Sequence, residues 1–348
     1  LEGTPYEVGF QFGNKCRTEI QRVLDKQYKV LGVPDIISKK DTLEVANKFW
    51  PYVKEYSPEI VDEITGMAEG ADVLKDEIFL LNAWTEMMWD LKPKDYSGNG
   101  CTSYAVTGTA TSTGETVGGQ SDDTVVEFKE DYFVVKVKPE KGPKFIGPTR
   151  AGSIPCAYYG MNSDGLCVLA NLLESPTMQM GVPSNFMKRK ALMQSNLDDA
   201  KDVIIKATRV SAQNYLIFDK KGGIINIETT PEKYVVLNAK DDIMCHTNHF
   251  VSPELENQET IDFLSNCKSR YDRMTELLKQ KHGSINIKDL MKFASDHGKY
   301  PDSICTHIED SPQHGLGTVV VLLFEPNKSK LWVATGTPCN NPYEEYNL

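Results

Sequence analysis

The sequence predicts an α+β protein in which sheets pack together and helices cover their outer faces. Helix-type apolar spacing fills the first quarter of the chain, and from residue 101 the pattern changes to alternating, β-branched and aromatic segments. The later strands come in blocks separated by blocks of helices. This order is typical of a layered α+β protein and not of one-for-one βα alternation.

The N-terminal quarter is predicted to be helical. Thr4 and Pro5 begin it as an N-cap and a first-turn proline, and apolar residues follow at helical spacing as far as residue 24. Residues 43–68 and 77–88 have the same spacing. Residues 92–100 contain proline and glycines among polar residues, which predicts a loop.

The remaining chain predicts blocks of strands and helices that end in a hairpin. The expected strands are 103–106, 132–137, 144–146, 157–161, 166–170, 215–218, 224–228, 234–237, 318–324 and 331–335. The expected helices are 185–207, 259–279 and 287–295.

Length and charge limit the classes of function. A chain of 348 residues is long enough for one large domain or two modest ones. The chain has a net charge of -11 and a pI of about 5.2, so its average field repels nucleic acid and anionic membranes. No apolar run approaches the ~20 residues of a membrane-spanning helix. We therefore expect neither nucleic acid nor a membrane as a partner. Because the chain begins with Leu1 and not Met, we expect that an initiator or leader is missing, which leaves a cytoplasmic and a secreted location both open.

The eight cysteines are scattered and form no C-x-x-C motif, which argues against a redox site or a zinc ribbon. The polar run 245–249 has the sequence Cys-His-Thr-Asn-His. It could be a zinc site, or it could be a turn held by Asn and Thr side chains. Zinc is disfavoured because no further ligand pair stands at a suitable spacing. Asn248 is of more interest as an amide donor to an oxyanion. We expect no metal and no cofactor.

The junction Gly100-Cys101 joins a glycine-containing loop to a strand whose first residue carries a thiol. Cys101 could attack the Gly100 carbonyl and form a thioester by an N-to-S shift, because glycine leaves that carbonyl open and tolerates a strained backbone. Hydrolysis would free an α-amine with a pKa of about 7.7–8.0, which can accept the thiol proton. The alternative is a structural cysteine buried in a strand.

Two further polar segments are candidates for the site. Residues 119–123 place acidic side chains directly after an expected strand, where a carboxylate could hold an amine or could simply be solvated in a loop. Residues 300–307 form a proline-led segment with hydroxyls, a thiol and an imidazole.

Taken in order, seven segments resemble the acyl-coenzyme A:isopenicillin N acyltransferase-like family of N-terminal-nucleophile (Ntn) hydrolases. The similarity covers nearly the whole chain. The segments are 3–9 (GTPYEVG), Leu81-Asn82 with Thr85-Glu86, Gly100-Cys101-Thr102, Gly119-Gln120 with Asp123, 181–184 (GVPS), 246–249 (HTNH), and Tyr300-Pro301 with Ser303-Ile304-Cys305.

The resemblance implies a four-layer αββα sandwich and self-cleavage between Gly100 and Cys101. It implies a helical α segment, 1–100, that stays associated with a β segment, 101–348, as one globular unit. Cys101 would be the nucleophile and, through its freed amine, the base. Asp123 matches the family's carboxylate near the nucleophile, Asn248 matches its oxyanion donor, and Ser103 matches a hydroxyl position that the family links to precursor processing.

The implied activity is that of an Ntn cysteine amidohydrolase or acyltransferase acting on linear amides. The enzyme would cleave or transfer the acyl group of a small-molecule amide through an acyl-Cys101 thioester. The alternatives are a strict acyl-CoA-dependent N-acyltransferase of the penicillin type and a hydrolase of N-β-alanyl amines. A non-catalytic protein that kept the fold ranks last, because Gly100 and Cys101 are both present.

One position departs from the family pattern. The penicillin-acylating members carry an arginine directly after Ser-Ile-Cys, whereas this chain has Thr306 followed by His307. Without that guanidinium, Asp123 either loses a charge partner or has a weaker, pH-dependent one in His307. Penicillin is therefore a doubtful substrate, while the amide chemistry is unaffected.

Overall fold

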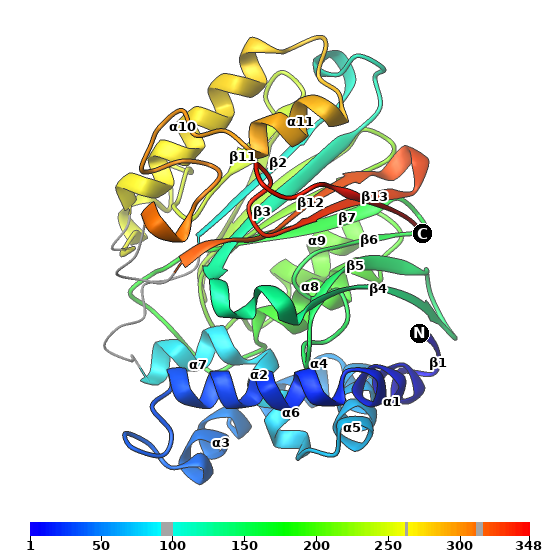
Figure 1. The fold of residues 1–348 in the computed structure, drawn as a ribbon, viewed down its shortest axis with the longest axis vertical. Coiled ribbons are helices and arrows are strands. Elements are labelled where there is room, and N and C mark those ends of the chain that lie inside the picture. Colours follow the sequence, from blue (N-terminus) through cyan, green and yellow to red (C-terminus); the bar gives the residue numbers. More distant parts are fainter. Residues whose placement is uncertain (92–99, 262–263, 311–315) are drawn as a thin grey trace.

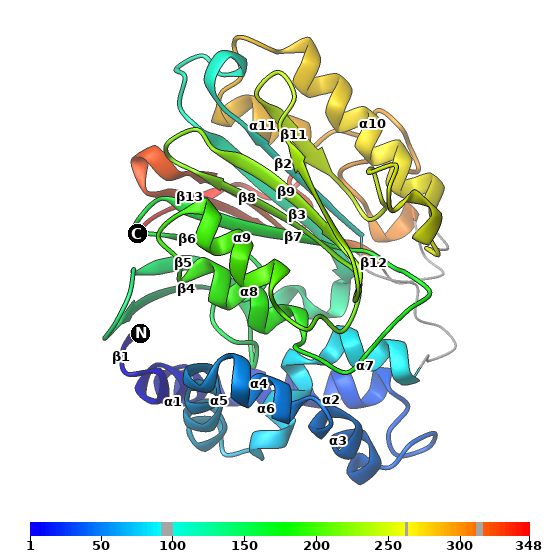
Figure 2. The ribbon, with the colours of Figure 1, turned by 180° about the vertical axis from the view of Figure 1, so that it is seen from behind.

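Two stacked β-sheets form the centre of the molecule (Figure 1). The computed structural model describes residues 1–91, 100–261, 264–310 and 316–348. One sheet has six strands in the order β11-β2-β3-β12-β13-β14, and the other has eight in the order β1-β4-β5-β6-β7-β8-β9-β10. The helices α8 and α9 pack against the eight-stranded sheet, and α10 and α11 pack against the six-stranded sheet (Figure 2). This confirms the four-layer αββα arrangement.

The strands of the six-stranded sheet are β2 (Gly100–Val106), β3 (Val117–Val125), β11 (Ile243–His246), β12 (Leu316–Glu325), β13 (Lys330–Thr335) and β14 (Glu344–Asn347). The strands of the eight-stranded sheet are β1 (Glu2–Gly3), β4 (Tyr132–Pro139), β5 (Phe145–Arg150), β6 (Gly160–Asn162), β7 (Leu166–Leu172), β8 (Gln213–Asp219), β9 (Ile224–Thr229) and β10 (Tyr234–Asn238). The outer helices are α8 (Ser184–Leu192), α9 (Leu197–Ile205), α10 (Leu264–Gln280) and α11 (Ile287–Ala294).

The two faces of each central strand contribute to different cores. Cys167, Leu169 and Phe218 pack in the layer between the sheets together with Val320 and Leu322. Their sequence neighbours on β7 and β8 instead join the core beneath the outer helices. This alternation follows from the two-residue period of a strand, and burial of both faces explains why the middle of each of these strands is apolar.

The N-terminal quarter is helical, as predicted. It consists of α1 (Pro5–Lys15), α2 (Arg17–Val30), α3 (Lys39–Asn47), α4 (Trp50–Tyr56), α5 (Pro58–Ala71), α6 (Lys75–Asn82) and α7 (Trp84–Leu91). Thr4 and Glu7 form a capping box at the start of α1. The stretch 43–68, expected as one helix, is divided because Pro51 lies in the first turn of α4 and Pro58 begins α5.

Most predicted strands and helices are present with shifted ends. The expected helix 185–207 is divided into α8 and α9. The placement of residues 119–123 after a strand was wrong, because they lie inside β3, which is hydrogen-bonded to β2 on one side and β12 on the other. Of the loop predicted over 92–100, residues 92–99 lie outside the described residues and Gly100 begins β2. Within the described ranges, no helix combines the length and apolar character needed to cross a membrane.

Candidate active site

Cys101 lies on β2, between β11 and β3 in the six-stranded sheet. Its side chain is buried, with 7% exposed, and lines a cavity of about 60 Å³. The register pairs Cys101 with Asp122 and Gly100 with Asp123. Paired residues share a face of the sheet, so the thiol and Asp122 lie on the side that faces the second sheet, where Tyr159 also lines the cavity.

Polar groups from three elements fix Cys101. Its backbone N–H donates to Oδ1 of Asn248 at 2.6 Å, and its carbonyl accepts from Nη1 of Arg270 at 2.7 Å. Its Sγ lies 3.7 Å from Oδ1 of Asp122. Burial, followed by the charges of Asp122 and Asp123, raises the pKa of the thiol well above its ordinary value, and Arg270 opposes this shift. The thiol therefore needs a nearby base before it can act as a nucleophile.

Asn248 follows β11 and reaches back to the junction. Its Oδ1 accepts from Cys101 N–H and from Nη2 of Arg270 at 3.1 Å, and its Nδ2 donates to the carbonyl of Leu172 at 3.1 Å. Two donors on one side fix which end of the amide carries oxygen. The Nδ2 group has a second hydrogen that could serve a developing oxyanion.

The segment that carries Asn248 is held by Glu228 of β9. This carboxylate accepts from the ring of His246 at 2.8 Å and from the backbone N–H groups of Val251 at 2.6 Å and Ser252 at 3.1 Å. Although burial opposes its ionisation, these hydrogen bonds and the His246 charge lower the pKa of Glu228. In the polar run 245–249, the described contacts thus make His246 an anchor for the segment.

Arg270 of α10 is a site residue that the sequence analysis missed. It is fully buried and donates to the Cys101 carbonyl, to Thr102 Oγ1 at 2.9 Å and to Asn248. Its charge also opposes the rise in the pKa of Asp123. A guanidinium therefore reaches the junction from α10. The available signal was an arginine in the buried stripe formed by Cys267, Met274 and Leu278 of the same helix.

Asp122 and Asp123 are both buried but have different partners. Asp122 Oδ2 accepts from the hydroxyls of Tyr132 at 3.0 Å and Tyr159 at 2.9 Å. Asp123 Oδ1 accepts from Thr318 at 2.6 Å, while its Oδ2 has no hydrogen-bond partner among the described residues. Burial raises the pKa of both carboxyls, that of Asp123 to about 7.

Gly100 packs directly against Asp123. A Cβ at this position would lie 3.3 Å from Asp123 Oδ2 and 3.5 Å from Nη2 of Arg270. Gly100 is not among the glycines with positive φ. The room it leaves for these charged groups, and not a left-handed backbone, is therefore the structural reason for glycine here.

Among the described residues, Ser103 and His307 form hydrogen bonds with groups other than the Cys101 thiol. Ser103 Oγ donates to Asn171 Oδ1 on β7 at 2.6 Å, so it links the two sheets. The His307 ring contacts His297, Cys305 and Cys339 through Nε2, and its Nδ1 lies 4.0 Å from Glu309 Oε2. Neither oxygen of Asp123 is hydrogen-bonded to His307 among the described residues.

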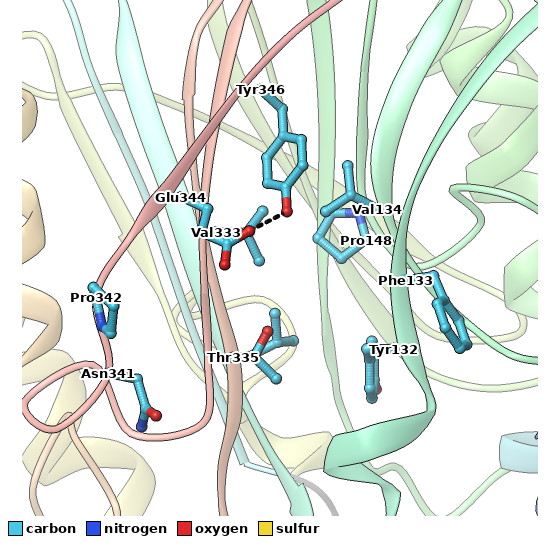
Figure 3. A pocket seen from close by; sticks show the side chains of 11 residues that line it. Tyr132, Phe133, Val134, Pro148, Val333, Thr335, Asn341, Pro342, Glu344 and Tyr346 are labelled. Atoms are coloured by element: carbon cyan, nitrogen blue, oxygen red, sulfur yellow. Dashed lines mark hydrogen bonds between the residues drawn. The ribbon is translucent and has the colours of Figure 1, made fainter.

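Two cationic side chains, Arg150 and Lys188, also line the Cys101 cavity. Burial lowers the pKa of Lys188 to about 8. A second hollow of about 230 Å³ lies between β4 and β5 of one sheet and the strands β13 and β14 of the other (Figure 3). Tyr132 lines both hollows.

The family model "Acyl-coenzyme A:6-aminopenicillanic acid acyl-transferase" matches residues 110–340. Among curated proteins, the chain is 26% identical over 349 residues to the "Acyl-coenzyme A:6-aminopenicillanic-acid-acyltransferase 40 kDa form" of Emericella nidulans, covering 99% of this chain and 94% of that protein. It is 27% identical over 250 residues to the "Beta-alanyl-dopamine/carcinine hydrolase" of Drosophila melanogaster, covering 66% of this chain and 63% of the relative.

Solved structures of lower similarity include a variant of conjugated bile acid hydrolase from Clostridium perfringens. It has a TM-score of 0.48 and 14% identity, and the match covers 71% of this chain and 97% of that one. Penicillin V acylase from Agrobacterium tumefaciens has a TM-score of 0.45 and 13% identity, with 68% and 83% covered.

Proposed function

Because this chain belongs to the acyl-coenzyme A:6-aminopenicillanic acid acyltransferase family, we propose that it is a self-processing amidohydrolase or acyltransferase whose nucleophile is Cys101. Its substrate is a small linear amide. The observation that carries the proposal is the environment of Cys101. Its thiol lines a cavity, and buried side chains hold both its N–H and its carbonyl.

Processing begins when the Cys101 thiol attacks the Gly100 carbonyl. The C–S bond forms, the Gly100–Cys101 C–N bond breaks, and the resulting thioester is hydrolysed by water to leave a carboxylate on Gly100 and an amine on Cys101. Arg270 holds the Cys101 carbonyl and Ser103 holds the strand against β7, so both position the junction. Asp123 packs against Gly100, so its carboxyl lies next to the residue whose carbonyl is attacked.

Catalysis then uses the freed amine of Cys101 as the base. The amine lies beside Asn248 Oδ1, takes the proton from Sγ and later gives it to the departing amine of the substrate. The base is required because the buried thiol has a raised pKa. The second hydrogen on Asn248 Nδ2 stabilises the oxyanion. Water or an acceptor amine finally attacks the acyl-Cys101 thioester.

The proposal is tested by expressing wild type, Cys101→Ala and the control Cys16→Ala. Cys16 is as buried as Cys101, with 7% exposed, but lies between α1 and α2. Wild type and the control should separate on a denaturing gel into fragments 1–100 and 101–348, whereas Cys101→Ala should stay whole. Wild type treated with amide substrates should gain an acyl mass on fragment 101–348.

Self-cleavage or amide turnover by Cys101→Ala would rule out Cys101 as the nucleophile. Hydrolysis and transfer are separated by adding an acceptor amine, or acyl-CoA with that amine, and following the products. Release of free acid alone identifies a hydrolase, and an N-acylated acceptor identifies an acyltransferase. The beta-alanyl-dopamine/carcinine hydrolase among the relatives makes N-β-alanyl amines the first hydrolase substrates to screen.

A further inference from the structure

Four side chains that can bind a metal ion lie close together at the segment that follows α11. They are His297, Cys305 and His307 from this segment and Cys339 from the turn after β13. Their ligand atoms all lie within 4.8 Å of one another. Among the described residues, these four form the group of His, Cys, Asp or Glu side chains that is close enough to share one metal ion. Cys305 is buried, His307 is half-buried and the other two are exposed, so an ion could enter from solvent.

The spacing of these atoms is close to that of a tetrahedral zinc site. Bonds of about 2.3 Å to sulfur and about 2.0–2.1 Å to nitrogen place two sulfurs about 3.8 Å apart, two nitrogens about 3.3 Å apart, and a sulfur and a nitrogen about 3.5 Å apart. The Cys305 and Cys339 sulfurs are 3.6 Å apart. The Nε2 atoms of His297 and His307 are 3.0 Å apart, and His307 Nε2 lies 3.8 Å from Cys305 Sγ and 3.3 Å from Cys339 Sγ.

A hydrogen bond between the two histidines or a disulfide between the two cysteines would explain this geometry less completely than a bound metal ion. A hydrogen bond between His297 and His307 would use one ring nitrogen of each, and it would leave the convergence of both thiols on the same point without a cause. A disulfide requires the sulfurs to approach to about 2.05 Å. In the structure Cys305 and Cys339 are thiols.

We propose that His297, Cys305, His307 and Cys339 bind one Zn²⁺ ion. Two thiolates with two imidazoles in a tetrahedral arrangement are typical of zinc. Four protein ligands leave no open position, so the ion is structural and not catalytic. The Nδ1 atom of His307 faces Glu309 Oε2 at 4.0 Å, which leaves Nε2 directed at the ion.

The zinc would fix the position of Thr306, which lies between two of the ligands. The Thr306 N–H donates to Thr318 Oγ1 at 3.0 Å, and Thr318 donates to Asp123 Oδ1 at 2.6 Å. Two hydrogen bonds therefore connect the zinc-binding segment to the carboxyl that packs against Gly100. The metal site itself does not depend on the proposed function.

Metal content of the full chain tests the site. Protein purified with reductant and chelator, then freed of both, is titrated with Zn²⁺ and passed through a desalting column before its zinc is measured by mass spectrometry. Wild type should bind about one equivalent. Cys339→Ser and His297→Gln each remove an exposed ligand and should weaken binding by at least about tenfold, since even the loss of an outer-shell partner costs about 10–100-fold.

Two control variants separate this site from other zinc-binding groups. His282→Gln removes an exposed histidine whose ring contacts the backbone of Asp241, and Cys101→Ala removes the junction thiol. Both should bind zinc as wild type does. With Co²⁺ in place of zinc, the thiolate-to-metal absorption band should fall to about half in Cys339→Ser.

Equal zinc content in wild type, Cys339→Ser and His297→Gln would overturn the proposal. So would a wild-type chain that stays metal-free with reduced thiols under excess Zn²⁺. Loss of about two mass units on a peptide joining Cys305 to Cys339, in protein kept under reductant, would also overturn it in favour of a disulfide.

Discussion

Asp122 and Asp123 are adjacent in sequence but face opposite sides of β3. Asp122 shares a face with the Cys101 thiol, and Asp123 packs against Gly100 beneath α10. The family resemblance points to Asp123 as the carboxylate near the nucleophile, yet Asp122 is the one beside the sulfur. The two carboxyls therefore have different surroundings, one beside the thiol and one against Gly100, at the bond that we propose is cut.

The raised pKa of Asp123 predicts a pH-dependent cost to stability. The unfolded chain loses this proton near pH 3.8, whereas the folded chain keeps it until about pH 7. The folded state thus binds more protons between these values, so this group lowers stability as pH rises from about 4 to about 7. Asp123→Asn keeps an acceptor for Thr318 and avoids the buried charge, and it should stabilise the protein by about 3–4 kcal/mol at pH 8.

This effect is measured by denaturant unfolding at pH 5 and pH 8 on a Cys101→Ala background, so that both chains stay uncut. Asp62→Asn, at an exposed position on α5, is the control and should show no such difference. The gain for Asp123→Asn should be larger at pH 8. A gain that is equal at both pH values, or larger at pH 5, would contradict the burial argument.

Helices α1 and α5 cross with their backbones in direct contact. Gly9 and Gly13 face α5, and Gly66 and Gly70 face α1. A Cβ on Gly13 would lie 2.1 Å from the carbonyl oxygen of Met67, and a Cβ on Gly66 would lie 2.0 Å from that of Tyr6. Backbone atoms cannot rotate away as a side chain can, so glycine is required for this close packing.

We predict that Gly13→Ala destabilises the protein by about 2–4 kcal/mol through overpacking. The sign is informative, because alanine in a helix is otherwise favoured over glycine by about 1 kcal/mol. The control Asn14→Ala changes an exposed neighbour on the same helix and should be neutral or slightly stabilising. Thermal unfolding of the two variants checks this, and a rise in Tm for Gly13→Ala would refute the close crossing.

The N-terminal segment is integrated into the rest of the molecule. One core cluster contains residues of α1–α7 together with residues of β4, β5, β7 and β8. Asn82 accepts from the N–H of Ile154 at 2.7 Å and donates to the carbonyl of Gly152 at 2.9 Å, and Glu86 accepts from the N–H of Ser184 at 2.7 Å. Arg22 pairs with Asp131. Apolar and polar contacts therefore both join the segment before the proposed cleavage point to the segment after it.

We predict that fragments 1–100 and 101–348 stay together after cleavage. Processed wild type and uncut Cys101→Ala should elute at the same volume in native gel filtration, although only the wild type separates on a denaturing gel. Both fragments contribute residues to one apolar core, which salt does not weaken, so moderate salt should not separate the fragments. Elution of the helical fragment as a separate peak without denaturant would contradict this.

By itself, the sequence determined features that depend on neighbouring residues. The Thr4 cap with Pro5 at the start of α1 and the apolar strands of the two sheets follow from local spacing and backbone chemistry. The Gly100-Cys101 junction was visible because both residues lie next to each other in the chain. The order of the seven segments was also enough to indicate the family.

Only the tertiary structure decided which distant side chains meet. Strand register alone sets whether Asp122 or Asp123 faces the thiol, since a shift of one residue exchanges the faces. Arg270 reaches the junction across 169 residues of chain, a pairing that no local pattern records. His297 and Cys339 likewise come together with Cys305 and His307 only when the turn after β13 packs on the segment after α11. Polar side chains in such contacts have no periodic signature, because their positions are fixed by packing between elements and not by the period of any one element.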